Sequence, residues 1–226
     1  MPEEEPCAKP KPERVPFGWQ FWVFQIVLIA ILVAFSIYST CKQKKKADQI
    51  RTISSLRQIG LAFVEFENEF SSYPSEATAR LVIQRFPKQG HNLSGSSNAL
   101  FRQLFAAELT QSEAMFYAKV PGVRKPDGDI TPGELLEKGE VGFAYIAGLS
   151  STGSPARPIA FAPVIPGTKQ FDPKPFEGKA VFLRSDNSVT SLPIGKDGRV
   201  ILYGIDILSA ENPIWDGKSP DIRYPE

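Results

Sequence analysis

An uncharged apolar run from Phe21 to Tyr38 constrains this chain more than any other feature. It lies within a longer stretch from Trp19 to Ser39, and a helix of about 20 residues spans the hydrocarbon core of a bilayer. A helix is the required form there, because it satisfies its own backbone polar groups where no water is available. Trp19 at one end and Tyr38 at the other are typical of aromatic residues at membrane interfaces. The sequence therefore predicts a transmembrane helix over residues 17–40.

A buried core helix and a cleaved signal peptide are the two alternatives to this membrane span. The apolar run is unbroken and is followed directly by the basic sequence KQKKK, which disfavours a core helix. A signal peptide has an apolar region of about 7–15 residues followed by an A-x-A site, and neither feature is present. We therefore expect a permanent anchor.

Two polar segments flank the span. Residues 1–16 combine five prolines with charges of both signs, so we expect a disordered N-terminal tail. After the span comes a basic collar, which we expect to contact lipid headgroups. Because the net charge of the chain is only +1, the composition argues against a nucleic-acid partner. The collar consists of Lys42, Lys44, Lys45 and Lys46.

Beyond the collar, apolar residues recur every three or four positions, which predicts one apolar stripe on an α-helix. We interpret the span and the stripe as a single helix from Pro16 to Phe70, which stops before Tyr73-Pro74. Gly60 lies within it and costs up to about 1 kcal/mol relative to alanine, so we expect a close packing contact there. Ile50 and Ile53 lead into the helix packing stripe, which consists of Leu56, Ile59, Phe63, Phe66 and Phe70.

Short helices are expected after this long one, because serine or proline precedes several short apolar patterns. We expect a helix that is capped by Ser75 and runs through Arg85, and further helices at Ala99–Glu108 capped by Ser97, at Ser112–Lys119, and from Pro132 to Glu137. The side chains expected to face the core are Leu81, Val82, Phe86, Leu100, Leu104, Phe105, Met115 and Phe116.

From residue 141 onward the pattern changes to short alternating runs, which predict strands. A turn at 185–188 joins two of them into a hairpin, and Pro163 favours a strand end. We expect the tail, residues 211–226, to be an ordered coil laid over the sheet. The expected fold class is α+β, with the long helix packed on a small antiparallel sheet of three to five strands in a domain over residues 41–226. The expected strands are 141–146, 159–164, 179–184, 189–192 and 200–203.

The two cysteines, Cys7 and Cys41, flank the span, so they lie on opposite sides of the membrane and cannot pair within one chain. The domain after Cys41 has no cysteine and therefore no disulfide. Lipidation of Cys41 is an alternative, but the residues before it do not match the small-residue pattern of a lipoprotein signal, and we expect an unmodified thiol.

The sequence offers no constellation of residues for catalysis. His91 is the only histidine and lies in a loop rich in glycine and serine. Asp127 and Asp129 resemble the start of a calcium loop, but Pro132 stands where its glycine is required. Gly217-Lys218-Ser219 resembles the end of a phosphate-binding loop that lacks its first glycine. We expect no enzyme activity, no cofactor, no metal and no small-molecule substrate.

The helix also carries a family resemblance. The octapeptide at residues 55–62, SLRQIGLA, and the following Tyr73-Pro74 resemble the type IV pilin-like proteins and type II secretion pseudopilins, a prepilin-type group. In this group a histidine is often followed by nine residues and then by Asp-Gly. Phe176 and Asp186-Asn187 stand at the corresponding positions here, so the form of that hairpin is kept without the histidine.

This resemblance implies a membrane-anchored subunit that assembles with other pilin-like or secretion-apparatus subunits. It places the chain in the bacterial inner membrane, with a cytoplasmic N-terminus and an extracytoplasmic domain. Pilins are cleaved after a glycine and carry glutamate at the fifth position of the mature chain, whereas Val23 is the fifth residue after Gly18. The resemblance therefore does not imply cleavage. The alternative function is a solitary anchored domain that binds a protein or glycan.

The distribution of basic residues favours the opposite topology. Three lie before the span, at Lys9, Lys11 and Arg14, and more lie in and beyond the collar, which under the positive-inside rule would keep the domain in the cytoplasm. Long domains, however, are translocated largely regardless of charge. We therefore expect the topology that the resemblance implies.

Overall fold

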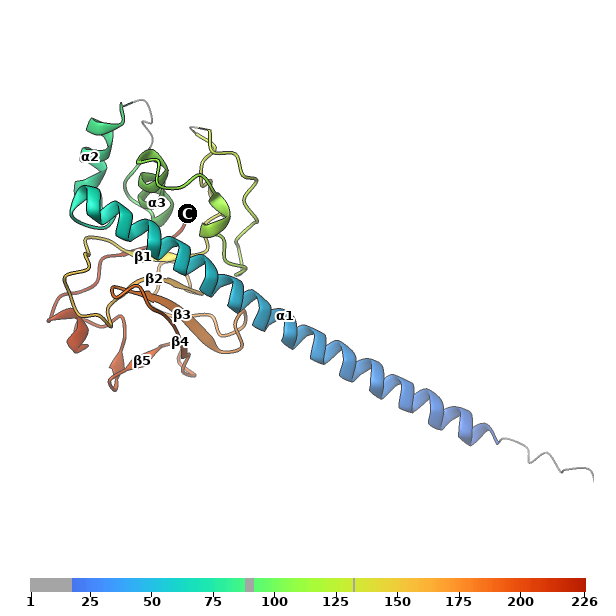
Figure 1. The fold of residues 1–226 in the computed structure, drawn as a ribbon. Helices are drawn as coiled ribbons and strands as arrows, with labels where there is room; N and C mark the ends of the chain where they lie inside the picture. The colour runs from blue at the N-terminus through green and yellow to red at the C-terminus, as the bar shows by residue number, and fades with distance from the viewer. Residues whose placement is uncertain (1–17, 88–91, 132) are drawn as a thin grey trace, which may run out of the picture. The chain divides into compact units, whose positions relative to one another are not determined.

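The computed structural model describes residues 18–87, 92–131 and 133–226. The chain forms two compact units, Met1–Cys41 and Lys42–Glu226. The long helix α1 (Trp19–Phe70) contributes to both units (Figure 1). Its expected end at Phe70 is confirmed, whereas Pro16 and the N-terminal tail lie outside the described residues.

The end of α1 follows from its backbone. Ser71 adopts a left-handed conformation with φ of 62°, and its N–H donates to the Glu67 carbonyl at 2.7 Å. A left-handed residue just after the last turn is a common helix stop, because it turns the chain away while one free carbonyl still receives a donor. The chain then enters the Tyr73-Pro74 turn, as the sequence predicts.

A five-stranded antiparallel sheet forms the rest of the fold, in the order β4-β3-β2-β1-β7. The predicted α+β class is therefore confirmed: a long N-terminal helix with a small antiparallel sheet. The hairpin of β3 and β4 is also confirmed, with Leu183 opposite Val189 next to its turn. The strands are β1 (Ala144–Ile146), β2 (Pro158–Ala162), β3 (Lys179–Arg184), β4 (Val189–Pro193) and β7 (Ile222–Arg223), with a separate pair β5 (Ile201–Leu202) and β6 (Ile205–Asp206).

Alternation along the strands separates two hydrophobic cores. On β3, Val181 and Leu183 belong to the first core, whereas Ala180 and Phe182 belong to the second. This is the period of two that places successive side chains on opposite faces of a sheet. The shift in β2–β3 pairing between Pro158 and Ala160 breaks the alternation. Consequently Ile159 and Ala160 both join the first core.

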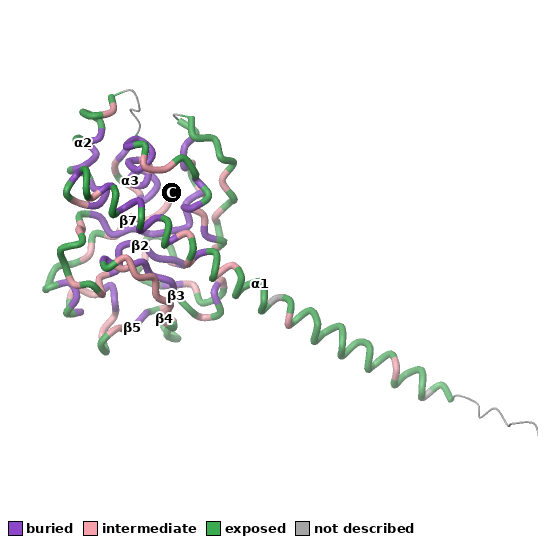
Figure 2. The backbone as a smooth tube through the Cα atoms, in the orientation of Figure 1, coloured by how far each residue is buried: buried purple, intermediate pink, exposed green. Residues whose placement is uncertain are grey.

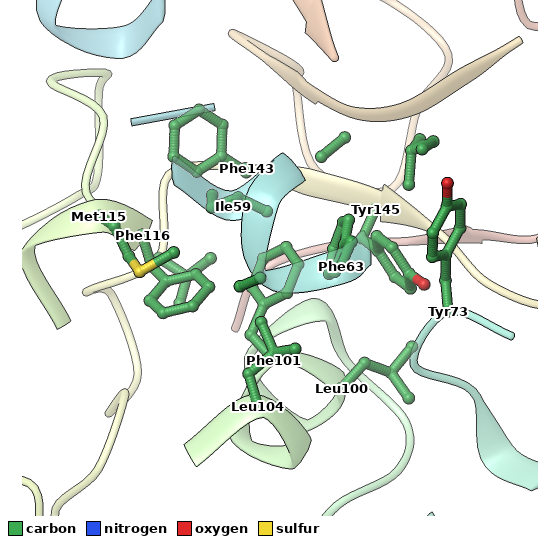
Figure 3. Close-up of a cluster of buried hydrophobic side chains, with 14 of the residues drawn as sticks. Ile59, Phe63, Tyr73, Leu100, Phe101, Leu104, Met115, Phe116, Phe143 and Tyr145 are labelled. Atoms are coloured by element: carbon green, nitrogen blue, oxygen red, sulfur yellow. The ribbon is translucent and has the colours of Figure 1, made fainter. Parts of the chain in front are cut away.

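The first core lies between the sheet and the C-terminal half of α1, together with α2 (Glu76–Arg85) and α3 (Ser97–Ala106) (Figures 1 and 2). Aromatic rings dominate it, with the ring centroid of Phe63 at 5.4 Å from that of Tyr145 and 5.5 Å from that of Tyr73 (Figure 3). Phe63 of α1 thus contacts both the turn that follows the helix, at Tyr73, and strand β1, at Tyr145.

The expected caps are partly right. Ser75 caps α2, because its hydroxyl accepts the Thr78 N–H while the Thr78 hydroxyl caps the Ser75 N–H in return. On α3 the cap is Ser96 and not Ser97. The Ser97 hydroxyl is instead buried and donates to the Phe143 carbonyl at 2.9 Å. The helix also ends at Ala106, before the left-handed Glu108.

The prediction of a helix over residues 112–119 is wrong. Only a short 3-10 helix forms, η2 (Glu113–Phe116), and Ser112 makes no capping hydrogen bond. The chain leaves the helix because the Phe116 carbonyl accepts the Gly142 N–H at 3.0 Å. Residues 133–136, where another helix was expected, form turns, and Pro132 lies outside the described residues.

Two expectations about burial and strand limits also need correction. Leu81 is 47% exposed, because α2 presents the neighbouring face with Thr78, Ala79 and Val82 to the core. The expected strand at 141–146 pairs only from Ala144, and the strand expected at 159–164 ends at Ala162, before Pro163. Of the other seven residues expected inward, six are buried, and Phe86 is half-buried against the first core.

The second core lies on the opposite face of the sheet and is covered by the C-terminal part of the chain. Trp215, in the 3-10 helix η3 (Pro213–Trp215), is buried with Phe161 and Phe182. Its indole N–H donates to the Ile207 carbonyl at 2.7 Å. The tail therefore covers the sheet as expected, but it also supplies strand β7, which the sequence pattern does not predict.

Candidate membrane anchor and helix-packing site

The apolar run of α1 has no cover within the described residues. Large side chains from Trp19 to Tyr38 are exposed, with Phe35 at 69%. Figure 2 shows the N-terminal part of α1 mostly in the colour of exposed residues. This is one helix, near the N-terminus, that is long and apolar enough to be a single membrane span. The hydroxyl of Thr40 donates to the Ser36 carbonyl at 2.8 Å, so this polar group is satisfied within the helix.

The basic collar follows on the same helix. All four of its lysines are exposed, and none of them makes an ion pair within the described part of the chain. The next charged residue, Asp48, is different, because its carboxylate lies 3.1 Å from Lys119 Nζ and 4.0 Å from a guanidinium nitrogen of Arg51. Asp48 is therefore the first residue after the collar that forms ion pairs among the described residues.

The structure brings all five stripe residues together in the first core. Leu56, Ile59 and Phe66 are fully buried, and Phe70 stacks on Phe66 with ring centroids 4.5 Å apart. Thr52 extends the buried face, with its hydroxyl donating to the Asp48 carbonyl at 2.9 Å. Sequence reasoning missed it because a threonine does not count as apolar, although its position fits the helical period.

The two residues expected to lead into the stripe behave differently. Ile53 is partly buried against the first core, whereas Ile50 is 58% exposed. The interpretation of Ile50 as part of the buried face is therefore wrong. Ile50 lies on the side of the helix opposite Leu56 and Ile59, since successive residues turn by about 100°.

The close contact expected at Gly60 is confirmed. A Cβ placed there would lie 2.9 Å from the Leu183 Cδ1 atom and would overlap the Asn187 side chain. Both residues belong to the β3–β4 hairpin, so glycine lets the helix backbone approach the hairpin. On the same helix, the Gln49 amide donates to the Ser191 hydroxyl of β4 at 3.1 Å.

The hairpin turn explains the residues at Asp186-Asn187. Asn187 adopts φ of 62°, the left-handed conformation that glycine takes easily and asparagine tolerates. The Asp186 carboxylate accepts the Ser188 N–H at 2.9 Å and the Ser188 hydroxyl at 2.6 Å. Phe176 is fully buried in the first core. These residues hold the turn and the core.

The buried carboxylates of Glu113 and Glu140 accept hydrogen bonds from backbone N–H groups of the loop that follows η2. These two residues were not identified from the sequence. Glu113 accepts the N–H groups of Leu136 at 2.6 Å and Gly128 at 3.0 Å. Burial raises the pKa of the Glu113 carboxyl, while these two hydrogen bonds oppose the shift. Glu140 is fully buried, accepts the Glu137 N–H at 2.8 Å and lies 3.2 Å from Arg124.

The acidic residues of this loop are engaged in turns. Asp127 accepts the Asp129 N–H and Asp129 accepts the Thr131 N–H, each at 2.9 Å. Among the residues that the structure describes, no group of three histidine, cysteine, aspartate or glutamate side chains could hold a metal ion. His91 and Cys7 lie outside the described residues.

No family model matches the chain, and no curated protein or solved structure shows a significant similarity to it. The chain combines an uncovered apolar helix segment, a basic collar, and a stripe on the same helix that organises the core of an α+β domain.

Proposed function

We propose that this chain is a non-enzymatic, single-pass membrane protein, a pilin-like subunit of a type II secretion or type IV pilus-like assembly. Its N-terminus lies in the cytoplasm and its domain lies outside the bacterial inner membrane. The partners are the lipid bilayer and other pilin-like or secretion-apparatus subunits. No nucleic acid, small-molecule substrate or cofactor takes part.

The main support for this proposal is that the two parts of α1 differ in polarity and burial. Its first part is apolar on all sides and exposed, whereas its later part buries one stripe in a folded domain. A helix that is apolar on all sides suits a lipid or protein environment, and an amphipathic one suits the surface of a domain. One helix with both characters links a bilayer to a domain, which is what an anchored assembly subunit requires.

Labelling of the two cysteines tests the topology. In cells with a permeabilised outer envelope, a membrane-impermeant maleimide is expected to label Cys41 and to leave Cys7 unlabelled until the inner membrane is lysed. Cys7→Ser and Cys41→Ser variants identify which thiol reacts. The reverse labelling pattern would place the domain in the cytoplasm and remove the secretion-pilin proposal.

Cross-linking in native membranes tests the assembly. We expect a short amine-reactive cross-linker to produce adducts that contain further copies of this chain or other subunits with an apolar N-terminal helix. A chain that stays monomeric in its membrane at native abundance would contradict the subunit role. That result would favour the alternative, a solitary anchored domain for a protein or glycan.

A further inference from the structure

The two edges of the five-stranded sheet differ in how well they are protected. Strand β7 forms one edge with only two residues, and its Arg223 forms ion pairs with Asp221 and Glu76. Strand β4 forms the other edge with five uncharged residues, Val189–Pro193 (Figure 1). Proteins usually block an edge strand by keeping it very short or by placing charges or proline on it. Strand β7 has the first two of these features, whereas β4 has only a proline at its end.

Hydrogen bonds at the two ends of the β3–β4 ladder show which way the backbone of β4 is turned. At one end the Arg184 N–H donates to the Ser188 carbonyl at 2.9 Å, and at the other the Ile194 N–H donates to the Gly178 carbonyl at 2.8 Å. Hydrogen-bonded pairs recur at every second residue of an antiparallel ladder. The even-numbered residues of β4 therefore bond to β3, and the odd-numbered residues do not.

The odd-numbered residues direct their backbone groups away from β3. Val189 and Ser191 each present an N–H and a carbonyl there, and Pro193 presents a carbonyl. No described residue forms a backbone hydrogen bond with these groups, and the bond from Gln49 to Ser191 joins side chains only. Strand β4 thus offers the backbone pattern to which a further strand can be added.

A second copy of the same strand fits this edge. In an antiparallel two-fold pairing centred on Ser191, the two Ser191 residues exchange hydrogen bonds, and each Val189 N–H meets the Pro193 carbonyl of the other copy. Because β4 is uncharged, no like charges meet along the strand. The same axis brings the exposed Asp186 beside the exposed Lys196 of the other copy, since the two residues lie equally far from Ser191 along the chain. The edge is therefore complementary to itself in backbone pattern and in charge.

We propose that β4 is a contact edge through which two copies of this chain pair antiparallel and join their sheets into one. This inference rests on the proposed function, because it assigns one contact of the assembly to a second copy of the chain. The paired strands are short, so the contact forms where a shared membrane raises the effective concentration of the copies.

Disulfide trapping of the full chain in its native membrane tests the pairing. In a background with Cys7→Ser and Cys41→Ser, Ser191→Cys places a single thiol at the centre of the contact. The Cα atoms of a hydrogen-bonded pair lie about 5.5 Å apart, within the range of about 4.4–6.8 Å that a disulfide bridges. We expect mild oxidation with copper phenanthroline in air to convert this variant to a covalent dimer.

Pro193→Cys is the matched control for the trapping experiment. Pro193 is exposed on the same strand, so its thiol is accessible to the oxidant. In the proposed register the two copies of this residue lie about 13 Å apart along the strand direction, which is too far for a disulfide. We expect the dimer yield of Ser191→Cys to exceed that of Pro193→Cys several-fold.

Charge variants test the register. In the Ser191→Cys chain, Lys196→Asp brings a carboxylate beside the Asp186 of the other copy, and we expect the dimer yield to fall several-fold. Combining Lys196→Asp with Asp186→Lys restores opposite charges and is expected to recover the yield. Lys218→Asp changes the net charge by the same amount at an exposed position outside β4 and its turns, and should leave the yield unchanged.

Hydrogen exchange of the wild-type chain supplies a measurement that needs no substitution. In detergent micelles that hold one chain, the amides of Val189 and Ser191 should exchange rapidly, because they have no partner in the described fold. In liposomes at a high ratio of protein to lipid, we expect them to exchange several-fold more slowly. The amides of β7 should exchange equally in both.

Several outcomes would overturn the proposal. Equal dimer yields from Ser191→Cys and Pro193→Cys would indicate random collision, and unchanged exchange at Val189 and Ser191 would show that the edge stays open. A disulfide from Ser191→Cys to a different protein would assign the edge to another subunit. If the amine-reactive cross-linker still joins copies while β4 gives no dimer, the assembly role stands and the edge alone is rejected. Copies that form no adduct with either reagent would overturn both proposals.

Discussion

At the scale of single residues, Gly60 shows how one missing side chain allows a helix and a hairpin to approach. The atoms that a Cβ would meet are the Leu183 Cδ1 at 2.9 Å and the Asn187 side chain. Glycine in a helix costs about 1 kcal/mol relative to alanine, so its presence here needs a packing reason. That reason is the hairpin turn on the other side of the contact.

We predict that Gly60→Ala lowers the free energy of unfolding by about 1 kcal/mol. Overpacking costs about 1–3 kcal/mol, and the better helix propensity of alanine offsets about 1 kcal/mol of it. Denaturant unfolding of the full chain in detergent, followed by the fluorescence of buried Trp215, measures the change. In an Asn187→Gly background the cost should be smaller, since the nearest atom is gone. The same cost in both backgrounds would show that the contact with Asn187 is not responsible.

Glu113 supplies a residue-scale prediction for pH. Burial raises the pKa of its carboxyl above the ordinary value of 4.5, so the folded chain holds this proton at a pH where the unfolded chain has released it. The resulting stability is fully present below 4.5 and is lost as pH rises through the folded-state pKa. Relative to Glu113→Gln, the wild type should therefore lose stability as the pH increases across this interval.

Asp129→Asn is the matched control for this experiment. Hydrogen bonds from Thr131 lower the pKa of Asp129 below 3.8, so its contribution is present above 3.8 and is lost as the pH falls. The two variants should thus differ from the wild type with opposite slopes. Unfolding free energies measured from pH 3 upward check both signs, and a flat difference for Glu113→Gln would contradict the role of its burial.

At the scale of secondary-structure elements, α1 has two faces within the domain that differ in burial. Phe63 is 1% exposed and packs against Phe101 and Tyr145, whereas Leu61, two residues earlier, is 60% exposed. The buried face connects α1 to α3 and to β1. The exposed face makes no such connection among the described residues.

We predict that Phe63→Ala destabilises the domain by about 3–5 kcal/mol, because it removes a buried ring and leaves a cavity. Leu61→Ala on the same helix should change stability by less than about 0.5 kcal/mol. Denaturant unfolding of both full-length variants in detergent makes the comparison. Similar losses from the two substitutions would mean that the stripe is not what holds α1 to the sheet.

At the scale of the whole molecule, the chain places its two hydrophobic cores on opposite faces of one sheet. The first core is built around α1, and the second is covered by the segment that contains η3. Each face of the sheet is therefore buried, which fits the nearly continuous burial of β2 and β3. All strands of the sheet lie in the second half of the chain, and the first half supplies the helices that cover one of its faces.

Processing of the anchor is the prediction that belongs to the intact molecule. Because no glutamate stands five residues after Gly18, we predict that the membrane-extracted protein keeps Cys7. Intact mass spectrometry of the protein purified from its native membrane measures this directly. A product that begins at Trp19 would show cleavage of the pilin type.

Local periodicity explains which features the sequence alone determined. The apolar run and the collar are evident from local composition, and the five-residue stripe and the β3–β4 hairpin depend on repeats of about 3.6 and 2 residues within a short window. The cap at Ser75 depends on a contact only three residues away. Such features are encoded by neighbours in the chain, so they can be predicted without knowing the fold.

Long-range contacts explain what only the tertiary structure decided. The pairing of β7 with β1 joins Ile222 to Ile146, and the two residues of β7 are too few to carry an alternating pattern. The burial of Glu113 depends on donors at Gly128 and Leu136. The ion pair between Asp48 and Lys119 exists only because the chain after η2 returns beside α1. In each case the partner is distant along the chain, so its position is set by the packed fold and not by local spacing.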